Sequence, residues 1–352
     1  MAAYTTIDNP ELYFQVKLYT GNETDNTAYT FDGDEDMQPD LLWFKERSST
    51  SDHALWDSVR GTNKKLEPST TQADSTEDVI TFDSDGFSVD DHSQINQDTI
   101  TMVCWAWKAG SAFSNDASAT SIGDIDSSGS ASTTAGFSIC SYTGSGSAGD
   151  EIKHGLDKTP EMLIFKNRST VVTWIVGSKP AGFTNIQFLQ DDDAATDDSN
   201  AFNDTDPTSS VFTLGGNAGT GTNETDSSFI CYAFTSIQGY SKIGSYTGNG
   251  STDGTFVYTG FRPAYILFKK TSDVSEWSIF DNKRNTFNVV DNHLYADLSN
   301  AEGADDDLDF LSNGFKFIRA GGNTNASGST YIYMAFAEAP FVNSNGVPCN
   351  AR

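Results

Sequence analysis

The sequence is poor in basic residues and in long apolar runs, and each shortage excludes a class of protein. Lys and Arg number 21 against 49 Asp and Glu, which gives a formal net charge of −28. A surface this acidic repels nucleic acid and anionic membranes. No stretch approaches the ~18 consecutive apolar residues of a transmembrane helix. The first residues hold no basic segment followed by an apolar run, so we expect no signal peptide and folding in a cytoplasm.

Cysteine and histidine are also scarce, at four each, and their positions suit neither a disulfide framework nor a zinc site. No CxxC pair and no HxxxH or HExxH spacing occurs. Cys104 and Cys231 occupy the same place in two apolar segments, so we expect small buried side chains there. Neither a GxSxG nor a Walker-type loop is found, which argues against two common catalytic designs.

What the sequence does contain is one unit in three successive copies. Each copy opens on Tyr-Thr-Gly and runs through a proline to an apolar segment that ends in Phe-Lys. These pairs are Pro39 and Lys45, Pro160 and Lys166, and Pro263 and Lys269. The copies divide the chain into an N-terminal arm (1–13), copy 1 (14–108), a low-complexity connector (109–135), copy 2 (136–240), copy 3 (241–340) and a C-terminal tail (341–352).

The pattern within each copy predicts β-strands. Short apolar runs alternate with Gly, Asn, Asp and Ser clusters, and no segment has a period of 3.6 residues. Runs such as Met162 to Phe165 are apolar on both faces, which is typical of central strands. Asp85-Gly86 and Asn313-Gly314 predict tight hairpin turns with φ > 0. Each copy is about 100 residues long, so we expect an all-β chain of three tandem β-sandwich domains.

A charged set recurs at fixed offsets from the Phe-Lys lysine in copies 1 and 3. The sets are Lys45, Asp57 and Arg60 in copy 1, and Lys269, Asp281 and Arg284 in copy 3; copy 2 has Ser178 and Ala181 instead. A recognition cluster and a structural salt bridge are both compatible with this pattern. Because the charges recur together with the fold, we favour a salt bridge that ties a strand to the following loop.

Tryptophans and acidic clusters allow similar alternatives. Trp174 and Trp277 share one register beside an apolar strand, which favours core packing over sugar stacking. Acidic clusters could bind calcium, which prefers several oxygen ligands on a loop. The candidates are Asp32, Asp34, Asp36, Asp305, Asp307 and Asp309, with a further cluster at Asp191 to Asp193. None matches an EF-hand, so we favour solvated acidic loops and expect no cofactor.

Several strings resemble a repeat found in virion proteins of tailed bacteriophages, notably marine phages. They include Ser141-Tyr142-Thr143-Gly144, Phe165-Lys166-Asn167-Arg168-Ser169 and the segment from Gly239 to Gly250. The resemblance covers nearly the whole chain. It implies a component of the phage particle, often in or near tail fibres, with jelly-roll or concanavalin-like sandwiches. It implies no catalytic residues.

These observations together favour a non-enzymatic structural component of a phage particle: a tail fibre, an appendage or a capsid-surface protein. Such a protein would be assembled in the host cytoplasm and act through assembly and adhesion. Its partners would be other virion proteins and further copies of itself, with a trimer as the usual expectation for fibres. The alternative is a carbohydrate-binding protein for host-surface glycans, assisted by calcium. An enzyme such as a glycan depolymerase is the third hypothesis.

Overall fold

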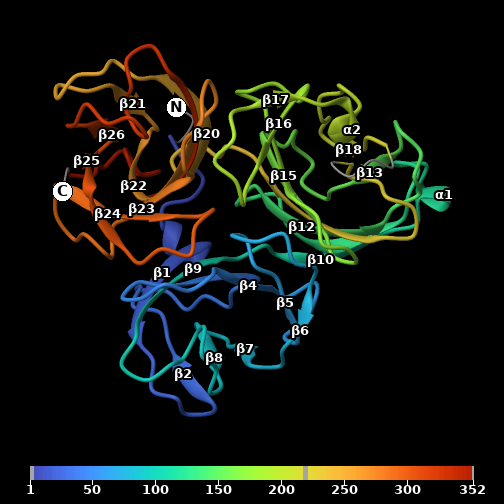
Figure 1. The fold of residues 1–352 in the computed structure, drawn as a ribbon, viewed down its shortest axis with the longest axis horizontal. Helices are drawn as coiled ribbons and strands as arrows, with labels where there is room; N and C mark the ends of the chain where they lie inside the picture. Colours follow the sequence, from blue (N-terminus) through green and yellow to red (C-terminus); the bar gives the residue numbers. More distant parts are fainter. Residues whose placement is uncertain (1–3, 217–220, 351–352) are drawn as a thin grey trace.

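The computed structural model describes residues 4–216 and 221–350, with the side chains of residues 305–307 outside the description. The chain is almost entirely β-structure, as Figure 1 shows, which confirms the predicted all-β class. Three lobes surround a common centre, and each lobe corresponds to one copy of the repeat. Among the described residues, no helix has the length and apolarity to cross a membrane.

The elements follow the three copies. A 3-10 turn at Pro10–Leu12 precedes copy 1, whose strands are β1 (Phe14–Thr20), β2 (Thr27–Tyr29), β3 (Leu41–Glu46), β4 (Ala54–Asp57), β5 (Lys64–Lys65), β6 (Ser75–Thr76), β7 (Ile80–Phe82), β8 (Phe87–Val89) and β9 (Thr101–Trp107). The connector and copy 2 contain β10 (Ser111–Asn115), α1 (Ala117–Thr120), β11 (Ser127–Ser132), β12 (Phe137–Thr143), β13 (Glu151–Lys153), β14 (Met162–Asn167), β15 (Trp174–Ser178), β16 (Asn185–Phe188), β17 (Thr196–Asp197), α2 (Ser199–Phe202), β18 (Val211–Thr213) and β19 (Ser228–Phe234). Copy 3 contains β20 (Ser241–Thr247), β21 (Phe256–Tyr258), β22 (Phe261–Lys270), β23 (Ser278–Asp281), β24 (Val290–Tyr295), β25 (Gly303–Leu311), β26 (Gly314–Phe317) and β27 (Thr330–Pro340).

Each copy builds the same antiparallel four-stranded unit. Its strand order is β1-β9-β3-β4 in copy 1, β12-β19-β14-β15 in copy 2 and β20-β27-β22-β23 in copy 3. The register is the same as well, because the phenylalanine of each Phe-Lys run pairs with the equivalent residue of the closing strand. These pairs are Phe44 with Cys104, Phe165 with Cys231, and Phe268 with Tyr333. The sequence repeat is therefore a structural repeat.

The central strands carry apolar side chains on both faces, and this determines how the three copies are arranged. In β14, Leu163 and Phe165 point into the core of their own lobe, whereas Met162 and Ile164 point into a core that all three copies share. Alternate side chains of a strand point to opposite faces, so a run that is apolar throughout needs a partner layer on each side. The expectation of three separate tandem sandwiches is not confirmed, because one face of each sheet packs against the other copies.

The connector between copies 1 and 2 is more ordered than its composition predicts. Residues 109–135 form β10, α1 and β11, and β11 pairs with β12 so that the sheet of copy 2 gains two strands. Backbone hydrogen bonds stabilise this hairpin, and its Phe113 packs against the core of copy 2. The equivalent strands β1 and β20 stay at the edges of their sheets.

The two predicted hairpin turns are present, with different backbone geometry. Gly86 joins β7 to β8 and has φ = 90°, which confirms the prediction. Gly314 begins β26, so the prediction of a positive φ is wrong there. A glycine is still required, because a Cβ at this position would lie 2.0 Å from the carbonyl oxygen of Val257.

Candidate functional site

The copies contact one another around a ring through the residue that stands eight positions after each Phe-Lys lysine. The donors are His53, Trp174 and Trp277, and the acceptors are the backbone oxygens of Tyr295, Glu67 and Phe188, at 2.9, 3.1 and 2.8 Å. Copy 1 thus donates a hydrogen bond to copy 3, copy 2 donates one to copy 1, and copy 3 donates one to copy 2. This is the closed head-to-tail pattern of a cyclic oligomer. Trp174 and Trp277 are buried, which confirms the predicted core packing.

His53 occupies the tryptophan position in copy 1 and acts as a neutral donor. Its Nδ1 accepts a hydrogen bond from the indole of Trp43 (2.8 Å), so Nε2 carries the proton that bonds to Tyr295. Burial, together with the nearby charge of Lys45, lowers the pKa of His53 to about 3. The histidine is therefore uncharged near neutral pH, as its place in an apolar seam requires.

Asp57 and Arg60 form a fully buried ion pair, and Asp281 and Arg284 form the same pair in copy 3. The distance from Arg Nε to Asp Oδ2 is 2.5 Å in copy 1 and 2.6 Å in copy 3. Each carboxylate also accepts the backbone N–H of its own arginine at 2.8 Å. Charge pairs taken out of water need this complete set of hydrogen bonds.

The same carboxylates accept a donor from another copy. The hydroxyl of Tyr232 donates to Asp57 Oδ2 at 2.6 Å, and the indole of Trp105 donates to Asp281 Oδ2 at 3.0 Å. Tyr232 and Trp105 are equivalent residues of the closing strands β19 and β9. The ion pair therefore ties one copy to the next, besides tying a strand to its following loop.

The third seam explains why copy 2 lacks the charged set. Copy 2 has Ser178 and Ala181, and the residue of copy 3 equivalent to Tyr232 and Trp105 is Met334, which carries no donor. Met334 lies in the shared core, and Ala181 packs against that core. The carboxylate, the arginine and the facing donor are thus absent together, so none of the three stands without its partner at this position.

The lysines of the charged set do not join these ion pairs. Lys45 donates to the backbone oxygen of Glu46 (2.6 Å), whereas Lys269 donates to that of Asp192 in copy 2 (2.7 Å). The equivalent Lys166 donates to the backbone oxygen of Thr71 in copy 1 (2.9 Å). Burial lowers the pKa of all three ammonium groups to about 8. Two of the three lysines therefore bind neighbouring copies through backbone carbonyls.

The predicted calcium candidates do not converge. Asp32 forms an exposed ion pair with Lys17 (2.6 Å), and Asp34 and Asp36 are exposed on the same loop. Asp309 pairs across the strands with Lys316, and burial raises its pKa. The side chains of Asp305 and Asp307 lie outside the described residues. Over the part of the chain that is described, only the carboxylates of residues 191–193 come within 4.8 Å of one another as a group, on an accessible loop.

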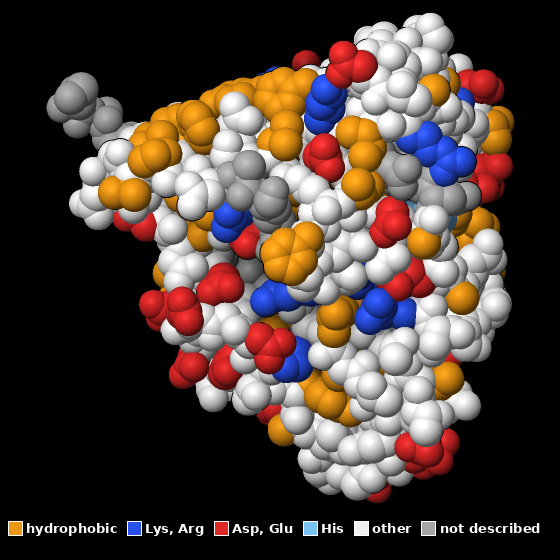
Figure 2. Space-filling view, turned by 90° about the vertical axis from the view of Figure 1, so that its left-hand side faces the viewer, with side chains coloured by type: hydrophobic (Ala, Val, Ile, Leu, Met, Phe, Trp, Pro, Cys, Tyr) orange, Lys and Arg blue, Asp and Glu red, His pale blue; other side chains and the backbone are white. Residues whose placement is uncertain are grey.

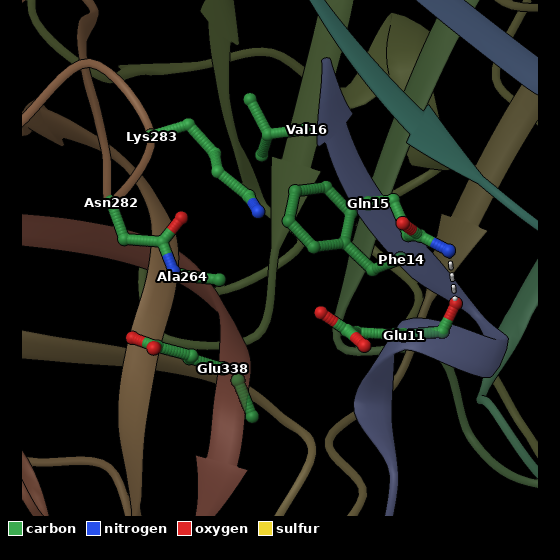
Figure 3. Close-up of a pocket in the computed structure, with 9 residues that line it drawn as sticks. Glu11, Phe14, Gln15, Val16, Ala264, Asn282, Lys283 and Glu338 are labelled. Carbon is green, nitrogen blue, oxygen red and sulfur yellow. Dashed lines mark hydrogen bonds between the residues drawn. The ribbon is translucent and has the colours of Figure 1, made fainter. Parts of the chain in front are cut away.

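A polar pocket opens where copy 3 meets the start of copy 1 (Figure 3). Its walls come from the 3-10 turn and β1 on one side, and from β22, β27 and the loop after β23 on the other. Figure 3 shows the carboxylates of Glu11 and Glu338 on opposite walls, with the amide of Asn282 beside Ala264. The ammonium of Lys283 lines the same space, so hydrogen-bond acceptors and a donor face one cavity of about 70 Å³.

One comparison with known families matches most of the chain. A family described as a domain of unknown function (DUF7483) matches residues 9–340. The chain belongs to this family. The match spans all three copies, so the family unit is the whole ring and not a single copy. No curated protein matches the chain.

Sequence reasoning misses one recurring residue of this family member, a buried asparagine in each copy. Asn96, Asn223 and Asn325 stand eight residues before Cys104, Cys231 and Tyr333 of the closing strands, and all three are fully buried. Each side-chain oxygen accepts the backbone N–H of the residue after Tyr-Thr-Gly, at 3.1, 2.7 and 2.9 Å. The constant spacing from the closing strand is the signal that could have revealed them.

Proposed function

We propose that the chain is a non-enzymatic structural component of a tailed phage particle, placed on a fibre, an appendage or the capsid surface. The strings that resemble phage virion repeats support this proposal. They lie in Tyr-Thr-Gly and Phe-Lys segments that build the four-stranded unit of each copy. The proposal places the protein in the virion after assembly in the host cytoplasm.

The observation that carries the proposal is the closed ring of three copies in one chain. Equivalent hydrogen bonds join every neighbouring pair, and one apolar core runs through all three lobes. The charged, histidine and tryptophan side chains that stand out in the sequence stabilise this ring. A compact block of this kind suits a role in which surfaces and rigidity matter more than a reacting centre.

The exposed apolar side chains are unevenly distributed and point to copy 3 as the face for assembly. Phe256, Tyr258, Phe287 and Val289 of copy 3 are 45%, 54%, 77% and 42% exposed. In Figure 2, apolar side chains gather over the upper part of the face, where copy 3 lies. Apolar side chains of this size on an acidic protein favour contact with another protein. We propose another virion protein as that partner.

Self-association remains a prediction. A single chain already closes a three-membered ring, so a trimer would place three such rings together. Light scattering coupled to size-exclusion chromatography measures this directly. A mass of three chains supports the fibre-like arrangement, and a mass of one chain favours attachment as single copies.

Immunogold electron microscopy on purified phage particles tests the main proposal. We expect gold particles at one defined structure of the virion, and mass spectrometry of the same particles should contain peptides of this chain. Absence of the protein from purified particles would overturn the proposal. Turnover of host polysaccharide by the purified protein would overturn its non-enzymatic part.

Carbohydrate binding is the second candidate, and the pocket between copies 3 and 1 favours it. Adhesion through glycans needs a concave site with several hydrogen-bonding groups beside an apolar wall. The pocket combines Asn282, Lys283 and two carboxylates with the side chains of Phe14 and Ala264. A phage component could have both functions.

A further inference from the structure

The pocket between copies 3 and 1 exists because copy 3 lacks a side-chain pair that the other copies have. In copy 1, Ser58 donates to the carboxylate of Asp40 at 2.6 Å. In copy 2, Lys179 donates to the carboxylate of Glu161 at 2.9 Å. The equivalent residues of copy 3 are Asn282 and Ala264.

One backbone hydrogen bond at this position is the same in all three copies, which allows the comparison. The N–H groups of Ser58, Lys179 and Asn282 donate to the backbone oxygens of Asp40, Glu161 and Ala264 at 2.8, 2.8 and 2.9 Å. The side chains differ, and β22 in addition continues past Ala264 through a β-bulge, whereas β3 and β14 begin at Leu41 and Met162. The space that a carboxylate fills in copies 1 and 2 is therefore open in copy 3.

The amide of Asn282 is left without its side-chain partner. Asn282 is 4% exposed, and its Oδ1 is buried without a hydrogen bond to any described residue. Because a buried amide oxygen without a donor is destabilising, native proteins usually satisfy it. Asn282 lines the pocket and its Oδ1 is covered in the unbound chain, so a rotation of the amide would bring this oxygen to a donor of a bound group.

The other polar groups of the pocket define what that bound group must carry. Glu11 accepts the backbone N–H of Asp34 (3.0 Å), and Glu338 pairs with Arg262 (3.1 Å), so both carboxylates are held in place. Lys283 forms no ion pair with the described residues and presents an ammonium donor. The ligand must donate to Asn282 and the carboxylates, and must also accept from Lys283.

Hydroxyl groups meet both requirements, because each hydroxyl donates one hydrogen bond and accepts others. The ammonium of Lys283 disfavours a metal cation, and the two carboxylates disfavour an anion. A cavity of about 70 Å³ holds several waters or one edge of a sugar ring. The side chains of Phe14 and Ala264 form an apolar wall for the C–H groups of such a ring.

We infer that this pocket binds one residue of a neutral glycan through its hydroxyl groups. The inference rests on the adhesive part of the proposed function and names its site. It assigns the binding to copy 3 alone, because copies 1 and 2 fill the equivalent space with Asp40 and Glu161.

Saturation-transfer NMR on the full chain tests the inference, with the methyl glycosides of glucose, galactose, mannose and N-acetylglucosamine as probes. At least one of them should bind at millimolar concentration. Ala264→Glu gives copy 3 the carboxyl group of copy 2 and fills the pocket. This variant should bind at least about tenfold more weakly. Its melting temperature should be unchanged or lower, because the new carboxylate lies near those of Glu11 and Glu338.

Two further variants secure the result. Lys283→Met removes only the ammonium donor from a partly exposed side chain, so it should fold normally and also bind more weakly. Lys179→Ala changes the equivalent exposed pair of copy 2 and should leave binding unchanged. Absence of binding by the wild-type chain, or equal binding by wild type and Ala264→Glu, would overturn the inference. The assignment to the virion is tested separately, by immunogold microscopy of phage particles, and does not depend on the result of this binding experiment.

Discussion

The ion-pair position between copies 1 and 2 can be given the uncharged residues that stand at the equivalent position between copies 2 and 3, and this exchange tests how the ring is stabilised. Asp57→Ser should destabilise the protein by about 3–5 kcal/mol, because it leaves the buried guanidinium of Arg60 without its counter-charge. It also removes the acceptor of the Tyr232 hydroxyl. The side chains of Asp57 and Arg60 are both 0% exposed, so solvent cannot compensate for the loss.

The triple variant Asp57→Ser, Arg60→Ala, Tyr232→Met introduces the residues that the third seam already uses. It removes the unpaired charge and the unpaired hydroxyl together, so it should recover about 2 kcal/mol or more relative to the single variant. Recovery should be partial, because the Arg60 guanidinium also donates to the backbone oxygens of Lys64 (2.9 Å) and Leu55 (3.2 Å).

Guanidinium chloride denaturation, followed by tryptophan fluorescence, measures both changes in the free energy of unfolding. Asp32→Ser is the control, because it breaks an ion pair at an exposed aspartate and should cost about 1 kcal/mol or less. A cost below about 1 kcal/mol for Asp57→Ser would refute the reasoning. A triple variant no more stable than the single one would also refute it.

Three further predictions concern the whole ring. The shared core predicts one cooperative calorimetric transition for the three copies, whereas separate transitions for individual lobes would contradict it. The buried cysteines Cys104, Cys140 and Cys231 have pKa values raised by burial. A thiol reagent should therefore label only the partly exposed Cys349 in the native protein, and rapid labelling of a second thiol would show that a lobe opens. Burial, with the hydrogen-bonded carboxyl of Glu276, raises the pKa of Asp297 to about 8. Between about pH 4 and that value the folded state binds more protons there than the unfolded state, so stability falls as pH rises through this window. Asp297→Asn should remove this dependence and gain stability over wild type at high pH; a gain that is equal at pH 5 and pH 9 in denaturation curves would argue against it.

The repeat and the nature of its strands are determined by the sequence alone. Periodic apolar runs, turn residues and identical spacings are local features, and local backbone preferences follow from them. The run from Met162 to Phe165 already shows that its strand is buried on both faces. The burial of Trp174 and Trp277 follows from the same reasoning.

Contacts between residues that are far apart in the sequence cannot be predicted from such local patterns. Asp57 and its donor Tyr232 are 175 positions apart, and the sequence gives no reason to pair them. The low-complexity composition of residues 109–135 likewise predicts only a connector between copies, whereas backbone pairing with β12 makes it part of a sheet. Backbone hydrogen bonds form irrespective of side-chain type, so composition is a weak guide there.

The role of the charged set and the place of the pocket were decided only by the tertiary structure. Lys45, Asp57 and Arg60 recur as a group in the sequence, but in the folded chain the lysine binds a backbone carbonyl. The other two form an ion pair within copy 1, and its carboxylate accepts a hydrogen bond from Tyr232 of copy 2. The pocket depends on the absence of a carboxyl group at Ala264. This absence is recognised only when Ala264 is compared in space with Asp40 and Glu161 of the other copies. Strand formation is local and can be predicted from the sequence. Ring closure depends on how the second apolar face of each sheet packs against the other copies, which only the tertiary structure shows.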